Sequence, residues 1–284
     1  MARAKKAAKP LPPIWHADDE LWARVEHVLA DLDPPANYGP ARIDQRAAFD
    51  GVIFRMRSGC QWNRLPGQYG DDASVHRTFQ RWVRRWVRRG VLKALWADLV
   101  AACADLGGVE WRWQSADCVL GKARHGGDKV GPNPTDRGKP GAKRSVLAEA
   151  DGGPLAVVVA PANVNDQKLL AETIEAVVVD RPDPAGVEQH LCLDKAYDNP
   201  TGEGAARAHG YTPHIRRIGE EKLDPATGSK RHPARRWVVE RTIAWLNKCR
   251  GILIRYDKKA ENYLALIQLQ CALLWYRRHR RLTT

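Results

Sequence analysis

Three acidic residues occupy positions from which a folded chain could bring them to one site. The alternating segment 109–119 predicts a strand ending near Asp117, and segment 189–194 predicts a strand ending at Asp194. Carboxylates at the ends of neighbouring strands converge at one edge of a sheet, where a packed helix can add a third, here Glu240. Three carboxylates with open coordination positions suit Mg²⁺ or Mn²⁺. Two such ions roughly 4 Å apart would catalyse an in-line displacement at phosphorus.

The segment that carries Glu240 has the pattern of an amphipathic helix. Residues 235–248 contain no Gly or Pro, and the helix is expected to begin just after Pro233. Glu240 is the single acid among four basic residues, which suits a carboxylate presented to a metal or a phosphate. From this helix alone, an ion pair between Glu240 and Arg236, one turn earlier, is an equally good interpretation.

The basic charge of the chain is concentrated in its last quarter. Residues 207–284 carry 18 Lys and Arg against 6 Asp and Glu, whereas the rest of the chain carries 28 against 27. A basic region on a nearly neutral body indicates a polyanionic partner, with nucleic acid the first candidate. The alternative is a generally basic soluble protein.

Cysteine spacing and hydropathy exclude several protein classes. The six cysteines are scattered and form no C-x-x-C pair, so neither a disulfide framework nor a zinc site is expected. Residues 1–9 lack the apolar core of a signal peptide, and no window reaches the roughly 18 apolar residues of a membrane helix. We expect a cytoplasmic, nucleoid-associated protein that is not secreted and has no membrane partner.

The first part of the chain predicts a small helical domain. Residues 1–13 have the composition of a flexible basic tail, and residues 14–107 contain helical patterns at 15–32, 44–58 and 74–89. The third helix is strongly basic, which is compatible with a helix-turn-helix-like DNA-binding domain; a helical bundle with a solvated arginine face is the alternative. The expected DNA contacts are Arg77, Gln80, Arg81 and Arg84.

The rest of the chain, residues 108–284, predicts an α/β domain with a mixed sheet flanked by helices. Besides the two strands that carry acids, strands are expected at 145–150, 155–160 and 211–216. A helix is expected from Asn165 to about Val179. The Gly-, Pro- and Lys-rich segment 121–144 predicts a loop. An apolar helix at 263–276 is expected to leave 277–281 as a basic tail.

Several motifs together resemble the DDE transposases of bacterial insertion sequences, most closely the insertion sequence five family. The resemblance rests on Ser115-Ala116-Asp117, on Leu193-Asp194-Lys195-Ala196-Tyr197-Asp198, and on Arg236-x-x-x-Glu240 followed by Ala244-Trp245-Leu246-Asn247-Lys248. Gly59-Cys60-Gln61-Trp62, Leu65-Pro66, Val164-Asn165-Asp166 and residues 250–256 also fit, so the resemblance covers nearly the whole chain.

This resemblance implies an RNase H-like catalytic domain with two Mg²⁺ or Mn²⁺ ions per active site. It further implies binding of the terminal inverted repeats, strand cleavage there, and transfer to target DNA without a covalent protein–DNA intermediate. Asp117, Asp194 and Glu240 would be catalytic metal ligands. The partner would be double-stranded DNA, at the element ends and at the target, bound by a homodimer. The expected DNA contacts in this domain are Lys195, Arg236, Lys248 and Arg250.

The chain departs from the wider group at two positions of its tyrosine–arginine–glutamate–lysine signature. The tyrosine and the lysine would stand at positions 233 and 247, where this chain has Pro233 and Asn247. Lys248 follows one residue later.

Two other functions are compatible with parts of the sequence. His214 and Arg217 form an H-x-x-R motif with Tyr256 downstream, loosely like a tyrosine recombinase, which would use a covalent phosphotyrosine and no metal. The other alternative is a DNA-binding protein that keeps the fold without the catalysis. Such a protein would tolerate Asp194→Asn.

Overall fold

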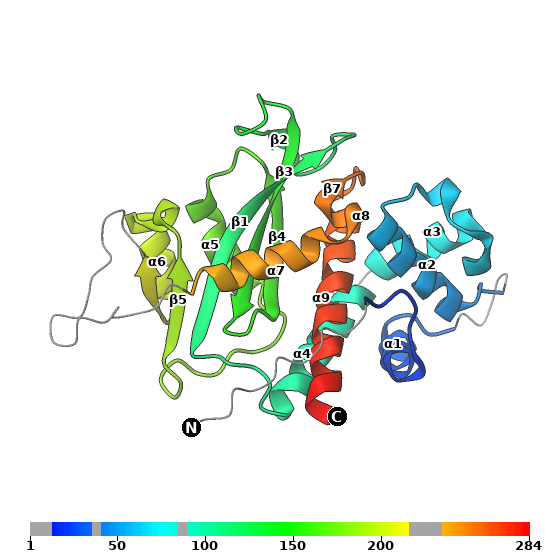
Figure 1. Ribbon diagram of the computed structural model, residues 1–284, viewed down its shortest axis with the longest axis horizontal. Helices are drawn as coiled ribbons and strands as arrows, with labels where there is room; N and C mark the ends of the chain where they lie inside the picture. The colour runs from blue at the N-terminus through cyan, green and yellow to red at the C-terminus, as the bar shows by residue number, and fades with distance from the viewer. Residues whose placement is uncertain (1–12, 36–40, 85–89, 216–234) are drawn as a thin grey trace, which may run out of the picture.

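The computed structural model describes residues 13–35, 41–84, 90–215 and 235–284 (Figure 1). Most of the predicted basic tail lies outside these residues, as do the end of the predicted third helix and Arg217 of the H-x-x-R motif. Within the described residues, no helix is long and apolar enough to cross a membrane.

Three helices at the N-terminal end form the predicted helical module: α1 (Asp19–Leu32), α2 (Gln45–Ser58) and α3 (Asp72–Arg84). Aspartates preceding the helices cap them, since Asp18 accepts from the Leu21 N–H and Asp44 from the Arg46 N–H. The helices pack around buried aromatic side chains such as Phe49 and Trp82. These predicted helices are confirmed.

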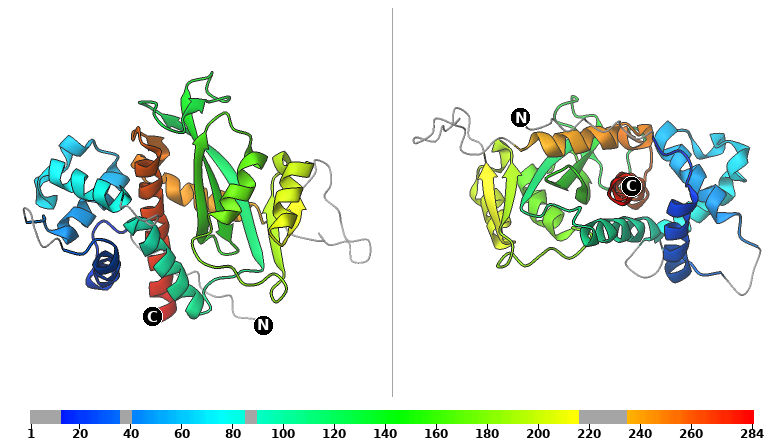
Figure 2. Two further views of the ribbon diagram at one scale, coloured as in Figure 1. Left: turned by 180° about the vertical axis from the view of Figure 1, so that it is seen from behind. Right: turned by 60° about the horizontal axis from the view of Figure 1, so that its bottom comes forward.

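A fourth helix, α4 (Val91–Asp105), was not predicted and connects the module to the sheet domain. It lies along the C-terminal helix α9 (Ala260–Thr283), as Figures 1 and 2 show. Trp96 of α4 and Trp275 of α9 both donate to the carbonyl of Pro154, at 3.1 and 2.7 Å. These shared bonds fix both helices to the sheet.

The sheet has the RNase H-like topology that the resemblance implied. Its main strands lie in the order β4-β3-β1-β5-β6; β3 runs antiparallel to β1 and β4, whereas β5 and β6 run parallel to β1. Short strands β2 and β7 pair with β3 and β1. The strands are β1 (Trp113–Ala123), β2 (Gly131–Pro132), β3 (Pro140–Glu149), β4 (Pro154–Pro161), β5 (Gln189–Leu193), β6 (Tyr211–Ile215) and β7 (Ile254–Arg255).

Helices cover both faces of this sheet (Figures 1 and 2). α5 (Asp166–Glu175) and α6 (Pro200–Ala208) lie on one face. α7 (Trp237–Asn247) lies on the other, and α9 packs along the edge strand β4, with the short helix α8 (Arg250–Leu253) between α7 and α9 in the chain. The predicted α/β architecture is therefore confirmed.

Two predictions of local structure were wrong. Segment 121–144 is not one loop, because β1 continues to Ala123 and β3 begins at Pro140. Their pairing, such as Leu120 opposite Lys143, joins residues distant in the chain and overrides the loop-like composition.

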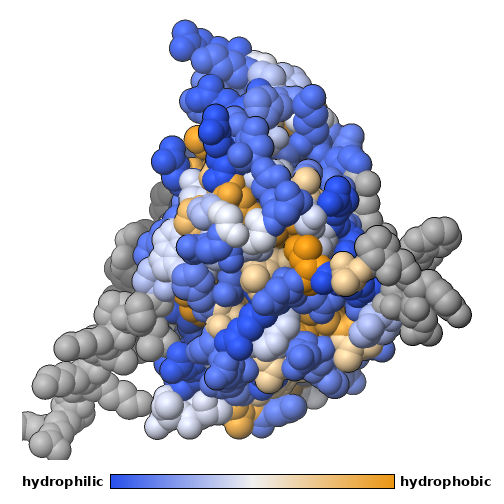
Figure 3. All heavy atoms as spheres, turned by 90° about the vertical axis from the view of Figure 1, so that its right-hand side faces the viewer, coloured by the Kyte–Doolittle hydropathy of each residue, from blue (hydrophilic) through white to orange (hydrophobic). Residues whose placement is uncertain are grey.

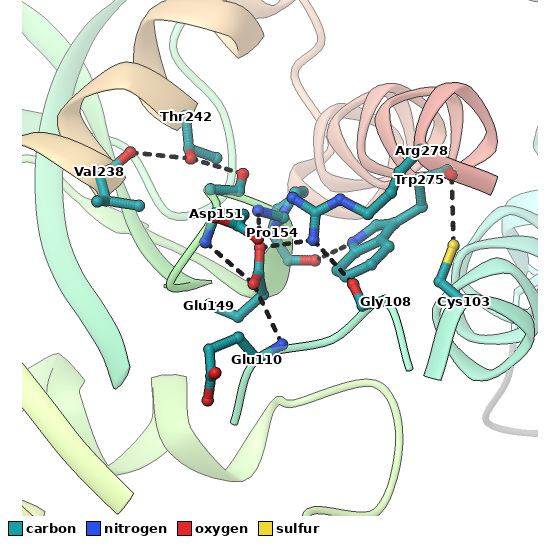
Figure 4. A network of polar contacts seen from close by, with 12 residues as sticks. Cys103, Gly108, Glu110, Glu149, Asp151, Pro154, Val238, Thr242, Trp275 and Arg278 are labelled. Carbon is teal, nitrogen blue, oxygen red and sulfur yellow. Dashed lines mark hydrogen bonds and ion pairs between the residues drawn. The ribbon is translucent and has the colours of Figure 1, made fainter. Parts of the chain in front are cut away.

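The predicted basic tail at 277–281 is also helical, as part of α9. Arg278 donates to the buried carboxylate of Glu149 at 2.7 Å (Figure 4). Glu149 also accepts from the backbone N–H groups of Gly153 and Asp151. Arg278 therefore serves to dock α9.

Candidate active site

Asp117 lies in β1, and Asp194 directly follows the neighbouring parallel strand β5. Ser115 of β1 pairs with Cys192 of β5, and continuing this register by two residues brings Asp117 opposite Asp194. Adjacent strands are separated by about 4.8 Å, and paired side chains share one face. β5 ends directly before Asp194, as predicted, but β1 continues for six residues beyond Asp117. The two acids thus meet where β5 stops beside the middle of β1.

The environment of Asp117 disfavours the negatively charged form of its carboxyl group. Burial, together with the negative charges of Asp194 and Glu240, raises the pKa of its carboxyl from 3.8 to about 6. A bond of 2.7 Å from the Cys118 N–H and the positive charge of Arg236 oppose this rise in pKa. The three acids are therefore within electrostatic reach of one another.

Helix α7 brings Glu240 to this face of the sheet. The helix packs against β1 and β3 through its buried apolar side, and the Thr242 hydroxyl donates to the carbonyl of Gly152 at 2.7 Å. Glu240 lies on the exposed side of α7. The amphipathic helix predicted from the sequence is confirmed.

Arg236 lies between two of the acids. Its Nη2 is 2.9 Å from Glu240 Oε1, and its Nη1 is 3.8 Å from Asp194 Oδ2. The ion pair between Arg236 and Glu240, which the sequence offered as an alternative to metal binding, is thus present. The three acids nevertheless also lie close together. In the described part of the chain, no three Asp, Glu, His or Cys residues are placed to hold a metal ion directly. The guanidinium supplies the positive charge that Asp194 and Glu240 share.

The predicted DNA contacts of the sheet domain fall into two groups. Lys195 and Arg236 flank the acids, and both are exposed. Lys248 and Arg250, also exposed, lie beyond the other end of α7. Twelve residues separate Arg236 from Lys248, which corresponds to about 18 Å along a helix. The basic side chains therefore extend from the acids towards the helical module.

The side chains predicted to contact DNA from α3 differ in whether they already bond to other parts of the protein. Arg77 is exposed and bonds to Ser74 of the same helix, and Gln80 bonds to His76. Arg81 instead pairs with the buried carboxylate of Asp33 at 2.9 Å, and so helps to hold α3 against the end of α1. For Arg84 the structure describes only the backbone.

The residues of the recombinase alternative are far apart. The His214 ring lies 5.0 Å from the Trp113 ring at the start of β1, whereas Tyr256 follows Arg255, which pairs with Ala123 at the end of β1. Ten residues of a strand span about 33 Å. This hypothesis is therefore wrong on geometric grounds.

A buried arginine near the site was missed by sequence analysis. Arg144 of β3 pairs with Val119, two residues from Asp117, so its side chain lies on the same face as Asp117. It is 1% exposed and donates to Asn247 Oδ1 at 2.8 Å. Because residue 144 fell in the predicted loop, no periodicity marked it as buried.

The order and directions of the strands define an RNase H-like fold. A family model described as "Transposase DDE domain" matches residues 110–275, and one described as "Putative transposase of IS4/5 family" matches residues 17–96. The chain belongs to the DDE transposase family. Its class is therefore that of a DDE-type DNA transposase, and an inert DNA-binding protein is not favoured.

Two relatives from Burkholderia cepacia support this membership. The "Putative transposase for insertion sequence element IS402" is 34% identical over 170 residues, which cover 57% of this chain and 76% of the relative. The "Insertion element IS402 uncharacterized 16.2 kDa protein" is 30% identical over 131 residues, covering 45% of this chain and 83% of that protein.

Solved structures of the Mos1 mariner transposase show a much weaker similarity. Its catalytic domain aligns at 11% identity and a TM-score of 0.29, covering 72% of this chain and 94% of that one. Its paired end complex with Mn aligns at 13% identity and a TM-score of 0.28, covering 98% and 82%. At these scores the similarity carries no argument about this chain.

Proposed function

We propose that this transposase cuts DNA at the terminal inverted repeats of an insertion sequence and joins the cut end to target DNA. The observation that carries the proposal is the convergence of Asp117, Asp194 and Glu240 on one face of the sheet, where their charges oppose one another. Such repulsion favours the binding of an external cation.

Membership of the DDE family implies the use of divalent metal, and we assign two Mg²⁺ or Mn²⁺ ions to these three carboxylates. The donor set fits, because hard oxygen ligands suit both ions and a guanidinium already lies between Asp194 and Glu240. When bound, such ions activate a water or a 3′-hydroxyl and stabilise the leaving oxygen. Metal binding would require the partly exposed Arg236 side chain to rotate away.

The basic residues of the site then act on the DNA. Arg236, released from the carboxylates, would bind a phosphate next to the cleaved bond with Lys195. Lys248 and Arg250 would bind the phosphate backbone along α7. No protein nucleophile is needed, because a water or a DNA hydroxyl attacks phosphorus.

The helical module would bind the same element end. Arg77 and Gln80 are its best candidates for base or phosphate contacts, since Arg81 is engaged by Asp33. Arg84 remains a further candidate. Because two ends must be joined to one target, we propose a homodimer on DNA.

Cleavage of a labelled element-end duplex tests this function. Wild type should cleave with Mn²⁺ and not with EDTA, and Asp194→Asn should bind the duplex without cleaving it. Cleavage in EDTA would overturn the metal-dependent mechanism. Binding without cleavage by the wild type would indicate an inert DNA-binding protein.

A further inference from the structure

A basic β-ribbon extends from the sheet beyond the candidate active site. β1 and β3 stay paired as far as Lys122 opposite Gly141, and β2 pairs with β3 at the outer end. We call residues 122–139 the basic ribbon. It stands at the top of the molecule in Figure 1, and this end is hydrophilic in Figure 3. Its exposed cations are Lys122, Arg124, Lys129, Arg137 and Lys139.

Within the described part of the chain, two of these cations are not paired with an acid. The three lysines lie within 4.0 Å of acids, Lys122 and Lys139 beside Asp136 and Lys129 beside Glu172. Arg124 and Arg137 have no carboxylate partner among the residues that the structure describes. Two unpaired guanidinium groups at the end of a ribbon suit the phosphates of a polyanion.

The ribbon is held in a fixed position by a buried arginine. Arg255 of β7 is 1% exposed, and its guanidinium donates to the carbonyls of Asp128 and Lys129 in the ribbon and of Asp257 and Lys258 beyond β7. Burying a guanidinium is costly unless it is well bonded. Such a clamp restrains the ribbon against motion relative to the sheet.

The same clamp is connected to the helical module. The Asp257 carboxylate pairs with Arg55 of α2 at 3.0 Å, and both side chains are buried. Close backbone packing supports this contact, because a Cβ at Gly251 would lie 2.9 Å from the Met56 carbonyl oxygen. The ribbon, the sheet and α2 are thereby held in one arrangement.

We propose that the basic ribbon is a DNA-binding arm, in which Arg124 and Arg137 bind phosphates of the element-end duplex that the helical module holds. This rests on the proposed function. Seven residues separate Asp117 from Arg124, about 23 Å along a strand. At about 3.4 Å per base pair, the contact falls roughly seven base pairs from the cleaved bond. The link from the clamp to α2 favours one duplex shared by ribbon and module over a separate target duplex.

Substitution of the two arginines tests the proposal without disturbing the clamp. The variant is Arg124→Gln with Arg137→Asn, since asparagine accepts the positive φ of 53° at residue 137. The matched control removes two exposed arginines elsewhere, Arg112→Gln with Arg207→Gln. Affinity for a fluorescent element-end duplex is measured by anisotropy across a salt series.

Loss of two phosphate contacts should lower the slope of log affinity against log salt by about 2, and the control should keep the wild-type slope. Phosphate-ethylation interference roughly seven base pairs from the cleaved bond should disappear only in the ribbon variant.

An unchanged slope and footprint would overturn the proposal. Unchanged end binding with reduced joining to target would overturn it too, by assigning the ribbon to target DNA. If the wild type failed to bind element ends at all, the proposed function itself would fail.

Discussion

Glu149 and the three active-site carboxylates belong to the same domain but have opposite surroundings. Glu149 is fully buried, and its oxygens accept from Arg278 and from the backbone N–H groups of Gly153 and Asp151 (Figure 4). Asp117, Asp194 and Glu240 are all partly exposed, and among the described residues Asp194 and Glu240 form ion pairs with Arg236.

The difference shows how the chain separates stability from chemistry. A carboxylate whose oxygens are saturated by its own chain has no capacity for an external cation and holds the fold together. Carboxylates that repel one another and keep open lone pairs destabilise the fold, but they can bind a cation. A substitution in the active-site carboxylates should therefore affect chemistry, and one at Glu149 should affect stability.

The largest effect is expected when an acid of the candidate active site is neutralised. Asp117→Asn should lower the cleavage rate by roughly a thousandfold or more. The melting temperature should stay the same or rise, because the change relieves repulsion from Asp194 and Glu240. Cleavage rates and thermal denaturation measure both, with the exposed Asp183→Asn as the unaffected control. Parallel loss of activity and stability would contradict the separation.

Neutralising the saturated carboxylate should have the reverse result. Glu149→Gln leaves the Arg278 guanidinium without its acid and should lower the free energy of unfolding by about 3 kcal/mol. The exposed Glu175→Gln should cost less than about 0.5 kcal/mol. Urea denaturation gives both values. A Glu149→Gln protein as stable as the wild type would show that this network does not hold the fold.

A somewhat smaller effect is expected where Asn247 replaces the lysine of the wider group. Asn247→Lys would place an ammonium beside the buried guanidinium of Arg144 and should lower the free energy of unfolding by about 2 kcal/mol. Adding Arg144→Met should restore part of this loss, which a double-mutant cycle measures. If the single and double variants lost the same stability, the contact with Arg144 would not explain why position 247 is asparagine.

The smallest effect is the pH dependence of stability. The folded-state pKa of Asp117, about 6, lies above its ordinary value of 3.8. Protonated Asp117 therefore contributes fully to the free energy of unfolding below about pH 4, and this contribution is lost as the pH rises through 6. Metal bound to the ionised carboxylate should counter this loss. The melting temperature with Mg²⁺ minus that with EDTA should therefore grow between pH 5 and pH 7. A constant difference, or the same growth in Asp117→Asn, would contradict the assignment of Asp117 as a ligand.

The sequence predicted those features that local pattern determines. The two strands before Asp117 and Asp194 alternate or run apolar, and the amphipathic pattern around Glu240 correctly predicted a helix. The order of strands and helices then indicated a mixed sheet.

Features that depend on distant partners could not be predicted. Arg278 was assigned to a tail because its partner Glu149 lies 129 residues away, and Arg81 gave no sign that Asp33 engages it. The outer part of β3 was taken for a loop because its strand character comes from pairing with β1. Arg144 was missed for the same reason.

The most direct test of the central claim is whether Asp194 touches the metal that cleaves DNA. In Asp194→Cys, a soft thiolate replaces a hard oxygen, and Mn²⁺ tolerates sulfur better than Mg²⁺ does. Cleavage of the element-end duplex by this variant should be lost with Mg²⁺ and regained in part with Mn²⁺, whereas the wild type cleaves with both. Equal cleavage by the variant with either metal, or cleavage by the wild type in EDTA, would contradict the claim that these carboxylates hold the catalytic ions.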